Sequence, residues 1–229
     1  MARKRGRPVN LEHRDQRREE ILDVAEKLFA RHGYAETDTQ MLADALRVGK
    51  GTIYRYYPSK ARLFHAIVNR GMEQLRQRVE SDVSPVIDPL ERIQQAISSF
   101  LLHFENHPQL AELFVQELAC FKKGNKPAYF AHHDMHIGPW RELYRQMIAQ
   151  GRVRSQLDHP EHDVVNDLLF GTIIANHALG RRGSARQQAK RIIDIVFHGI
   201  VTDAERSRAN NVNQPQTVNA AEQRRKKNS

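Results

Sequence analysis

The sequence has 229 residues and a net charge of +9, with 36 Lys and Arg against 27 Asp and Glu, and it contains one cysteine. This length allows one or two domains with real cores, and the mixed charge favours folding over disorder. The single cysteine excludes an internal disulfide, and no apolar run reaches the length of a membrane span. Since the start Met-Ala-Arg-Lys-Arg is also unlike a secretory signal, we expect a cytoplasmic protein without membrane contact.

The positive charge is concentrated at the two ends of the chain. Residues 1–18 hold seven Arg and Lys against two acidic residues, and residues 206–229 hold six against one. Basic ends on a nearly neutral body suggest an acidic polymer as a partner. For residues 206–229, which lack apolar periodicity, we prefer a disordered tail that keeps the protein soluble.

Apolar residues recur at helical spacing nearly throughout, and no strand-like alternation is present. We therefore predict an all-α fold of about nine helices. The first apolar stripe can end at Gly33 as a left-handed cap, and Ser59 can cap the helix that follows Pro58. Cys120 lies among apolar neighbours, which predicts a buried and inert thiol.

Residues 38–57 have the pattern of a helix-turn-helix. Thr37-x-x-Gln40 is a capping box for a first short helix, and a tight turn over residues 46–49 leads to a second one. Ala43, Val48 and Ile53 are spaced to pack the two helices across the turn, and in such motifs the second helix enters the major groove of DNA.

The outward face of this second helix suits DNA, although a generic solvated face is the alternative. It offers cations, a hydroxyl, phenols and a glycine that lets the backbone approach a phosphate. Lys60, in the first turn of the next helix, could also meet phosphate. The candidate DNA-binding residues of this region are Gln40, Lys50, Gly51, Thr52, Tyr54, Arg55, Tyr56 and Lys60.

A family resemblance follows from these residues. Three segments carry it: Ile21-Leu22-Asp23-x-Ala25-x-x-Leu28-Phe29-Ala30-x-x-Gly33-Tyr34, the pair Leu42-Ala43, and Val48-x-Lys50-Gly51-Thr52-Ile53-Tyr54-x-Tyr56-Tyr57-Pro58-Ser59-Lys60-x-x-Leu63. Together they closely resemble the N-terminal domain of TetR-family regulators. The match covers about residues 15–75. Gln40, Lys50, Gly51, Thr52, Tyr54, Tyr56 and Lys60 fall on the family's usual DNA-contacting positions, whereas Ile53 and Tyr57 fall on packing positions.

The resemblance implies a domain order and a function. A basic arm (1–14) precedes the DNA-binding domain (15–75), and a helical effector-binding and dimerisation domain (76–205) precedes the tail (206–229). The implied function is that of a sequence-specific, nucleoid-associated regulator, a repressor released from a palindromic operator by a small-molecule effector. It implies neither catalysis nor a cofactor.

Two residues of the turn depart from the family's habit. Arg47 stands where glycine is common, and a side chain in a left-handed turn costs about 1 kcal/mol. Gly49 stands where Ser or Thr is common, and as an N-cap it is worse by only about a few tenths of a kcal/mol. Both changes bear on the angle of the second helix, and hence on which DNA is read.

The N-terminal arm contains Arg5-Gly6-Arg7-Pro8, which resembles the core of an AT-hook. We hypothesise that Arg5 and Arg7 lie along a narrow A·T minor groove, where the negative potential is strongest. A non-specific electrostatic tail is the alternative.

The last two predicted helices, within residues 161–204, are the most apolar of the chain. Gly171, Ala175, Ala178 and Gly180 would permit close helix packing. The resemblance implies that these helices form a four-helix interface of a homodimer. The alternative is the core of a monomer, and the dimer is favoured on family grounds more than on the sequence.

The middle helices, about residues 89–150, are implied to line an effector pocket. Its aromatic candidates are Phe100, Phe104, Phe114 and Trp140, although a helical stripe of this kind is more often plain core. His132 and His136 are spaced to share a metal ion on one helix face, as are His133 and His136. Exposed or core histidines are favoured over a metal site, so a metal-responsive regulator is kept as an alternative.

Two other classes of function remain open. In the first, the chain is an architectural or partner-binding protein associated with DNA and has no effector. The second is an enzyme, which ranks last because the sequence has no nucleophile elbow, P-loop, zinc-protease motif or dinucleotide fingerprint.

Overall fold

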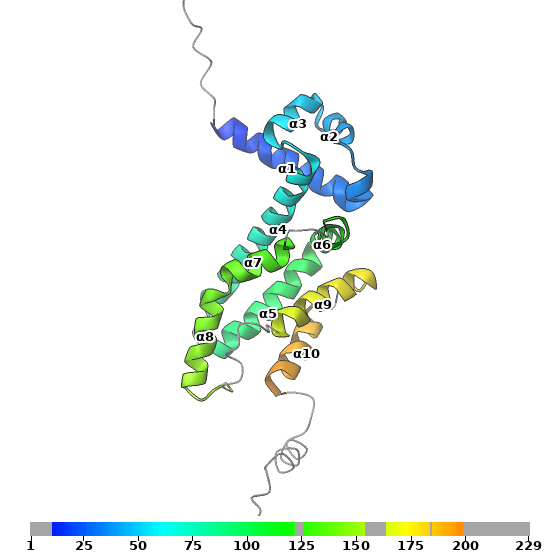
Figure 1. The fold of residues 1–229 in the computed structure, drawn as a ribbon. Helices are drawn as coiled ribbons and strands as arrows, with labels where there is room; N and C mark the ends of the chain where they lie inside the picture. Colours follow the sequence, from blue (N-terminus) through cyan, green and yellow to red (C-terminus); the bar gives the residue numbers. More distant parts are fainter. Residues whose placement is uncertain (1–10, 122–125, 154–163, 184, 199–229) are drawn as a thin grey trace, which may run out of the picture. The chain divides into compact units, whose positions relative to one another are not determined.

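The computed structural model describes residues 11–121, 126–153, 164–183 and 185–198. These residues form helices without any strand, which confirms the all-α prediction, and there are ten helices rather than about nine (Figure 1). They are α1 (Leu11–Glu36), α2 (Thr39–Leu46), α3 (Lys50–Tyr56), α4 (Lys60–Val83), α5 (Pro89–Asn106), α6 (Pro108–Cys120), α7 (Ala128–His136), α8 (Gly138–Ala149), α9 (Val164–Ala178) and α10 (Ala185–His198).

By its packing the chain divides into residues 1–190 and residues 191–229. Everything described below belongs to the first unit, apart from the end of α10. Of the second unit, residues 191–198 are described, and they continue α10, with Ile195 exposed. None of the described helices combines the length and hydropathy needed to cross a bilayer.

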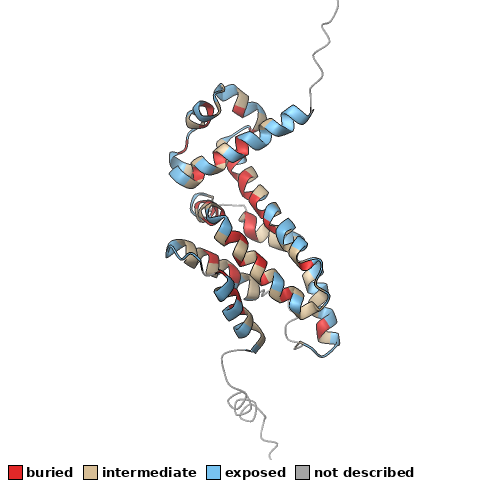
Figure 2. Ribbon diagram, turned by 180° about the vertical axis from the view of Figure 1, so that it is seen from behind, coloured by how far each residue is buried: buried red, intermediate tan, exposed pale blue. Residues whose placement is uncertain are grey.

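The N-terminal core forms where α1 and α4 pack together and α2 and α3 cover them. The predicted stripe of α1 is buried at Ile21, Ala25 and Phe29, which are all 0% exposed, and α4 buries Phe64 and Val68 against it (Figure 2). The Phe64 ring packs edge-on against Phe29, with centroids 5.4 Å apart. This core fixes the platform that carries the helix-turn-helix.

The second core lies between α5, α6, α7 and α9. Leu113, Phe114 and Tyr129 are its largest fully buried side chains, and Phe104 packs on Phe114 with ring centroids 5.7 Å apart. Asp88 begins α5 by accepting bonds from the amides of Leu90 and Glu91. α4 extends from the N-terminal core to the second core, where it packs on α5, α6 and α7, and α6 packs on α1 as well.

The start of α2 differs from the predicted capping box. Asp38 is the N-cap residue, and its carboxylate accepts a 2.8 Å bond from the amide of Met41, which lowers the Asp38 pKa. Thr37 is fully buried and donates its hydroxyl to the carbonyl of Gly33 at 2.8 Å. The Gln40 amide reaches forward to Asp44 instead of back, so the capping box is wrong.

Three other local predictions have clear outcomes. Gly33 has the positive φ expected of it (84°), but its ψ of 161° is extended, so α1 kinks there and continues to Glu36. The prediction for Ser59 is confirmed, because its hydroxyl accepts a bond from the amide of Arg62. Cys120 is exposed, so the buried thiol is wrong; the last turn of α6 places it outside the core.

Candidate DNA-binding surface and effector cavity

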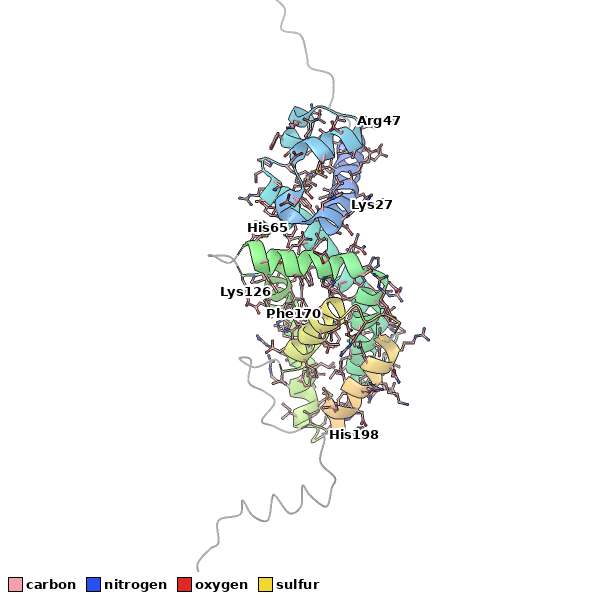
Figure 3. All side chains as sticks on the ribbon, turned by 90° about the vertical axis from the view of Figure 1, so that its right-hand side faces the viewer. Lys27, Arg47, His65, Lys126, Phe170 and His198 are labelled. Atoms are coloured by element: carbon pink, nitrogen blue, oxygen red, sulfur yellow. The ribbon has the colours of Figure 1, made fainter. Side chains whose placement is uncertain are left out.

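The turn between α2 and α3 has the geometry that its residues predict. Arg47 is left-handed (φ 54°, ψ 44°), and the amides of Arg47 and Val48 donate to the carbonyls of Asp44 and Ala43. Such a pair of bonds satisfies the free carbonyls at a helix end. Gly49 caps α3 without a side-chain bond. Figure 3 shows Arg47 at the outer edge of this motif.

Packing across the turn also follows the sequence. Ala43 is 1% exposed and Ile53 is 2% exposed, while Val48 is half-buried between the two helices. Tyr57 is buried as well and lies under the guanidinium of Arg18, 5.8 Å from the ring centroid. The inner face of α3 is therefore fixed, and its outer face remains for a partner.

The outer face of α3 presents most of the candidate DNA-binding residues. Lys50, Gly51, Tyr54 and Arg55 are exposed, whereas Thr52 and Tyr56 are half-buried. The Tyr54 hydroxyl lies 3.0 Å from the Thr39 hydroxyl, and the Arg55 guanidinium lies over the Tyr56 ring. These contacts orient the phenol and the cation before any DNA arrives. Arg5 and Arg7 lie outside the described residues, so their minor-groove role stays a prediction.

Lys60 has a different environment from the one predicted for it. Its ammonium donates to the carbonyls of Tyr34, Ala35 and Thr37 at 2.7, 3.2 and 2.9 Å. It also lies 4.5 Å from the centroid of the Tyr34 ring. The structure thus places the Lys60 cation at the end of α1, where it satisfies free carbonyls, and a phosphate contact would compete with these bonds.

A cavity of about 370 Å³ lies between α4, α5, α7, α8 and α9. Its walls are mainly apolar, and its size falls in the range of small-molecule sites. Phe100 and Trp140 lie on the wall, as expected of an effector pocket. Phe104 and Phe114 do not line this cavity; they pack in the neighbouring core, because their ring partners come from α5, α6 and α7.

The polar groups on the cavity wall, of which Arg92 is the most important, were not predicted from the sequence. Arg92 precedes the wall residues Ala96 and Phe100 by one and two turns of α5, and this spacing was the available signal. The Arg92 Nε is buried without a hydrogen-bond partner. Arg76, the other arginine on the wall, bonds to Glu73 and Glu80.

The histidines of α7 lie on the cavity side of the helix. The rings of His132 and His136 are 5.9 Å apart, and the Nε2 of His132 lies 3.1 Å from Oδ1 of Asn69. Burial, followed by the electrostatic interaction with His136, lowers the pKa of His132. Within the described ranges, no three His, Cys, Asp or Glu side chains form a group that could hold a metal ion.

Glu117 connects the cavity-lining helix α7 to α4. Its carboxylate is 4% exposed and accepts the free amide of Ala128 at the start of α7, with both oxygens at 3.1 Å. Burial raises the Glu117 pKa, and the Nδ1 of His65 on α4 lies 3.5 Å away. His65, in the second turn of α4, is labelled in Figure 3.

Comparison with protein families identifies the N-terminal domain. Residues 21–67 match the family described as "Bacterial regulatory proteins, tetR family". Residues 21–67 are therefore similar to the DNA-binding domain of that family. This match includes the α2–α3 motif and the first part of α4, and it ends before the cavity begins.

Similar proteins support the same domain and fold. The uncharacterized HTH-type transcriptional regulator YhgD of Bacillus subtilis is 29% identical over 43% of this chain and 51% of its own length. The nucleoid occlusion factor SlmA of Vibrio atlanticus is 33% identical over 46% of this chain and 55% of its own. The chain thus spans about half the length of the curated relatives that it matches. The crystal structure of AibR, with isovaleryl coenzyme A and operator DNA, shares the fold with a TM-score of 0.61 and 23% identity, over 79% of this chain and 98% of AibR.

Proposed function

We propose that this protein is an effector-responsive transcriptional regulator, a repressor that binds a palindromic operator through α3. The observation that carries the proposal is the TetR-type helix-turn-helix, whose outer face presents Lys50, Tyr54 and Arg55 to a partner. YhgD is named a transcriptional regulator, and AibR was crystallised with operator DNA, which supports the same role here. This role would place the protein in the cytoplasm, at the nucleoid.

The cavity supports regulation by a small molecule. Its wall includes α4, which begins at Lys60 directly after the helix-turn-helix and continues past Met72 along the cavity. A ligand that prefers one position of α4 would therefore shift the population of DNA-binding conformations. The AibR structure holds isovaleryl coenzyme A, so a relative of this fold binds a small molecule.

A homodimer would provide the two recognition helices that a palindrome requires. The face of α9 opposite the buried Leu169 and Ile173 supports this proposal. It carries apolar and small residues at helical spacing: Val164, Leu168, Gly171, Ala175 and Ala178. Val164 is 69% exposed and Leu168 is 38% exposed in the single chain. A second copy of α9 would cover this stripe.

An architectural protein bound to DNA is the second candidate. It is favoured by the similarity to SlmA, which is named a nucleoid occlusion factor. The two candidates differ in how strongly they prefer one DNA sequence and in whether a ligand changes that preference. Catalysis forms no part of either candidate, and the relatives are named as regulators.

A gel shift on the DNA upstream of the protein's own gene, in excess unrelated DNA, tests the proposal. We expect a specific complex that Lys50→Ala weakens about tenfold or more, because a good base or phosphate contact contributes about 1–3 kcal/mol. Lys27→Ala is the matched control, since Lys27 is exposed on α1 and away from the α2–α3 turn (Figure 3). Equal binding to unrelated DNA would favour the architectural candidate.

A further inference from the structure

We propose that the cavity binds a small organic acid, a carboxylate on an elongated apolar body, and that Arg92 is the charge partner of the carboxylate. This inference rests on the proposed function only in taking the cavity as the effector site. It is argued from the shape of the cavity, from the chemistry of its wall and from Arg92, the arginine of that wall for which no ion pair is found among the described residues.

The dimensions of the cavity favour an elongated ligand of modest size. Its wall follows α4 from Met72 to Val83, which corresponds to about 16 Å at the helical rise of roughly 1.5 Å per residue. The volume of about 370 Å³ is near the lower end for ligand sites and equals about a dozen water volumes. A chain of about a dozen heavy atoms would fill it.

The wall of the cavity selects an apolar body for the ligand. Leu75 and Val79 of α4, Ile93 and Ile97 of α5, and Leu143 of α8 all line it. Burying a hydrocarbon chain against such a wall is favourable by about 0.8 kcal/mol per methylene group. The affinity gained by burying the hydrocarbon chain is the same for any head group. The polar residues of the cavity wall therefore decide which head group is bound.

Arg92 supplies the reason for a negative head group. It lines the cavity, its Nε is buried without a hydrogen-bond partner, and no ion pair of Arg92 is found among the described residues. A buried guanidinium donor that has lost water without gaining an acceptor is costly. A carboxylate would satisfy it with the planar, two-oxygen geometry that arginine matches best.

The other charged groups on the wall do not compete for this role. Arg76 already pairs with Glu73 and Glu80, and the Glu80 side chain is 59% exposed, so solvent screens that cluster. His132 already has a partner, since its Nε2 lies 3.1 Å from Oδ1 of Asn69, and burial lowers the pKa of its ring. The unpaired positive charge on the wall is therefore that of Arg92 on α5, which lines the cavity together with Val83 at the end of α4.

The fluorescence of Trp140 provides a direct test, because this cavity-lining residue is the only tryptophan of the chain. The full chain is titrated with decanoate, decanol and decylamine, without DNA. We expect a saturable change with decanoate and binding about tenfold or more weaker with decanol and decylamine, since a bond to a charged group is involved. Equal affinity for decanol, or no binding of decanoate, would overturn the proposal.

Variants assign the effect to Arg92. Arg92→Met is expected to weaken decanoate binding about tenfold while leaving decanol binding unchanged, and Arg92→Lys is expected to lose less. Arg145→Met is the matched control, because Arg145 is exposed on α8 and pairs with Glu142 outside the cavity. Unchanged decanoate binding in an Arg92→Met protein with the melting temperature of the wild type would contradict the assignment.

The outcome is separable from that of the proposed function. If decanoate binds through Arg92 but the chain has no preferred DNA sequence, the ligand class stands and the repressor proposal fails. If a specific operator is found but no organic acid binds the cavity, the reverse holds. If decanoate releases the operator from the wild type but not from Arg92→Met, both the ligand class and the repressor proposal are supported.

Discussion

Lys60 holds the end of α1 to the start of α4. Its ammonium satisfies three carbonyls that follow the kink at Gly33, and the Tyr34 ring covers it. Free carbonyls at a helix end need such a partner when water cannot reach them. The orientation of α2, which begins at Thr39, depends on this anchor.

Lys60→Met is therefore expected to lower the free energy of unfolding by about 1.5–3 kcal/mol, the usual loss for hydrogen bonds to a charged group. Urea unfolding followed by circular dichroism measures the change. Lys50→Met is the control, because exposed Lys50 should alter stability by less than about 0.5 kcal/mol while weakening DNA binding. Equal stability of the two variants would rule out the anchoring role.

His103 makes the stability of the protein depend on pH. It is 7% exposed on α5, and burial, followed by the charges of His107 and Arg78, lowers its pKa to about 4. Below an unfolded-state pKa of about 6.5, the unfolded chain binds a proton that the folded chain does not. Stability is therefore lost as the pH falls from about 6.5 towards 4, by at most about 3 kcal/mol.

Urea unfolding at pH 7 and at pH 5 tests this contribution. We expect the wild type to lose more stability between the two than His103→Gln, which cannot be protonated. His198→Gln, which removes a histidine with a 72% exposed side chain, should behave like the wild type. A His103→Gln protein with the pH dependence of the wild type would assign the effect to other groups.

At the scale of helices, Arg70 connects α4 to α1. Its guanidinium donates to Glu19 at 3.0 Å, to Asp23 at 2.7 Å and to Glu26 at 2.6 Å, and these three carboxylates lie on one face of α1. The Arg70 side chain is 15% exposed, whereas those of Glu19 and Asp23 are about 60% exposed. Three acceptors around one arginine fix the two helices more firmly than a single surface pair would.

Arg70→Met is expected to reduce stability by about 1–3 kcal/mol, less than for a fully buried pair because two of the carboxylates are solvated. Thermal and urea unfolding measure the change. Arg17→Met removes the exposed Arg17–Glu20 pair within α1 and serves as the control, with an expected change below about 0.5 kcal/mol. Similar losses in both variants would mean that Arg70 does not clamp the helices.

The sequence predicts those elements whose signals are local. The apolar stripes of α1 and α4, the left-handed Arg47 and the cap at Ser59 depend on residues a few positions apart, and each is found where expected. The start of α2 was misplaced because Thr37 and Asp38 are both good N-caps. The burial of the Thr37 hydroxyl against the carbonyl of Gly33 decides between them, and this is a tertiary fact.

The cavity was harder to predict because periodicity shows which side of a helix is buried but not what buries it. Phe100 and Trp140 line the cavity, whereas Phe104 and Phe114 do not, although Phe100 and Phe104 pack on each other. Only the placement of α7, α8 and α9 separates the two pairs. Arg92 was missed since a lone arginine beside an apolar stripe is typical of a solvated helix edge.

For the molecule as a whole, the exposed stripe of α9 bears on the state of assembly. Leu168→Glu places a charge in the middle of the proposed interface, where burial without a partner is costly. We expect the variant to sediment as a monomer at concentrations at which the wild type is a dimer. Gln150→Glu, on the exposed end of α8, is the control for added charge. A dimeric Leu168→Glu would move the interface elsewhere.

Two of the attachments of α1 differ in their chemistry, and this difference has a consequence for ionic strength. Arg70 holds α1 to α4 through charges. Gln116 of α6, which is 8% exposed, holds α1 through a hydrogen bond that its side-chain amide donates to the carbonyl of Phe29 at 2.9 Å. Added salt screens the first attachment and leaves the second unchanged. High ionic strength would therefore weaken the Arg70 contact to α4 and leave the Gln116 contact to α6 in place.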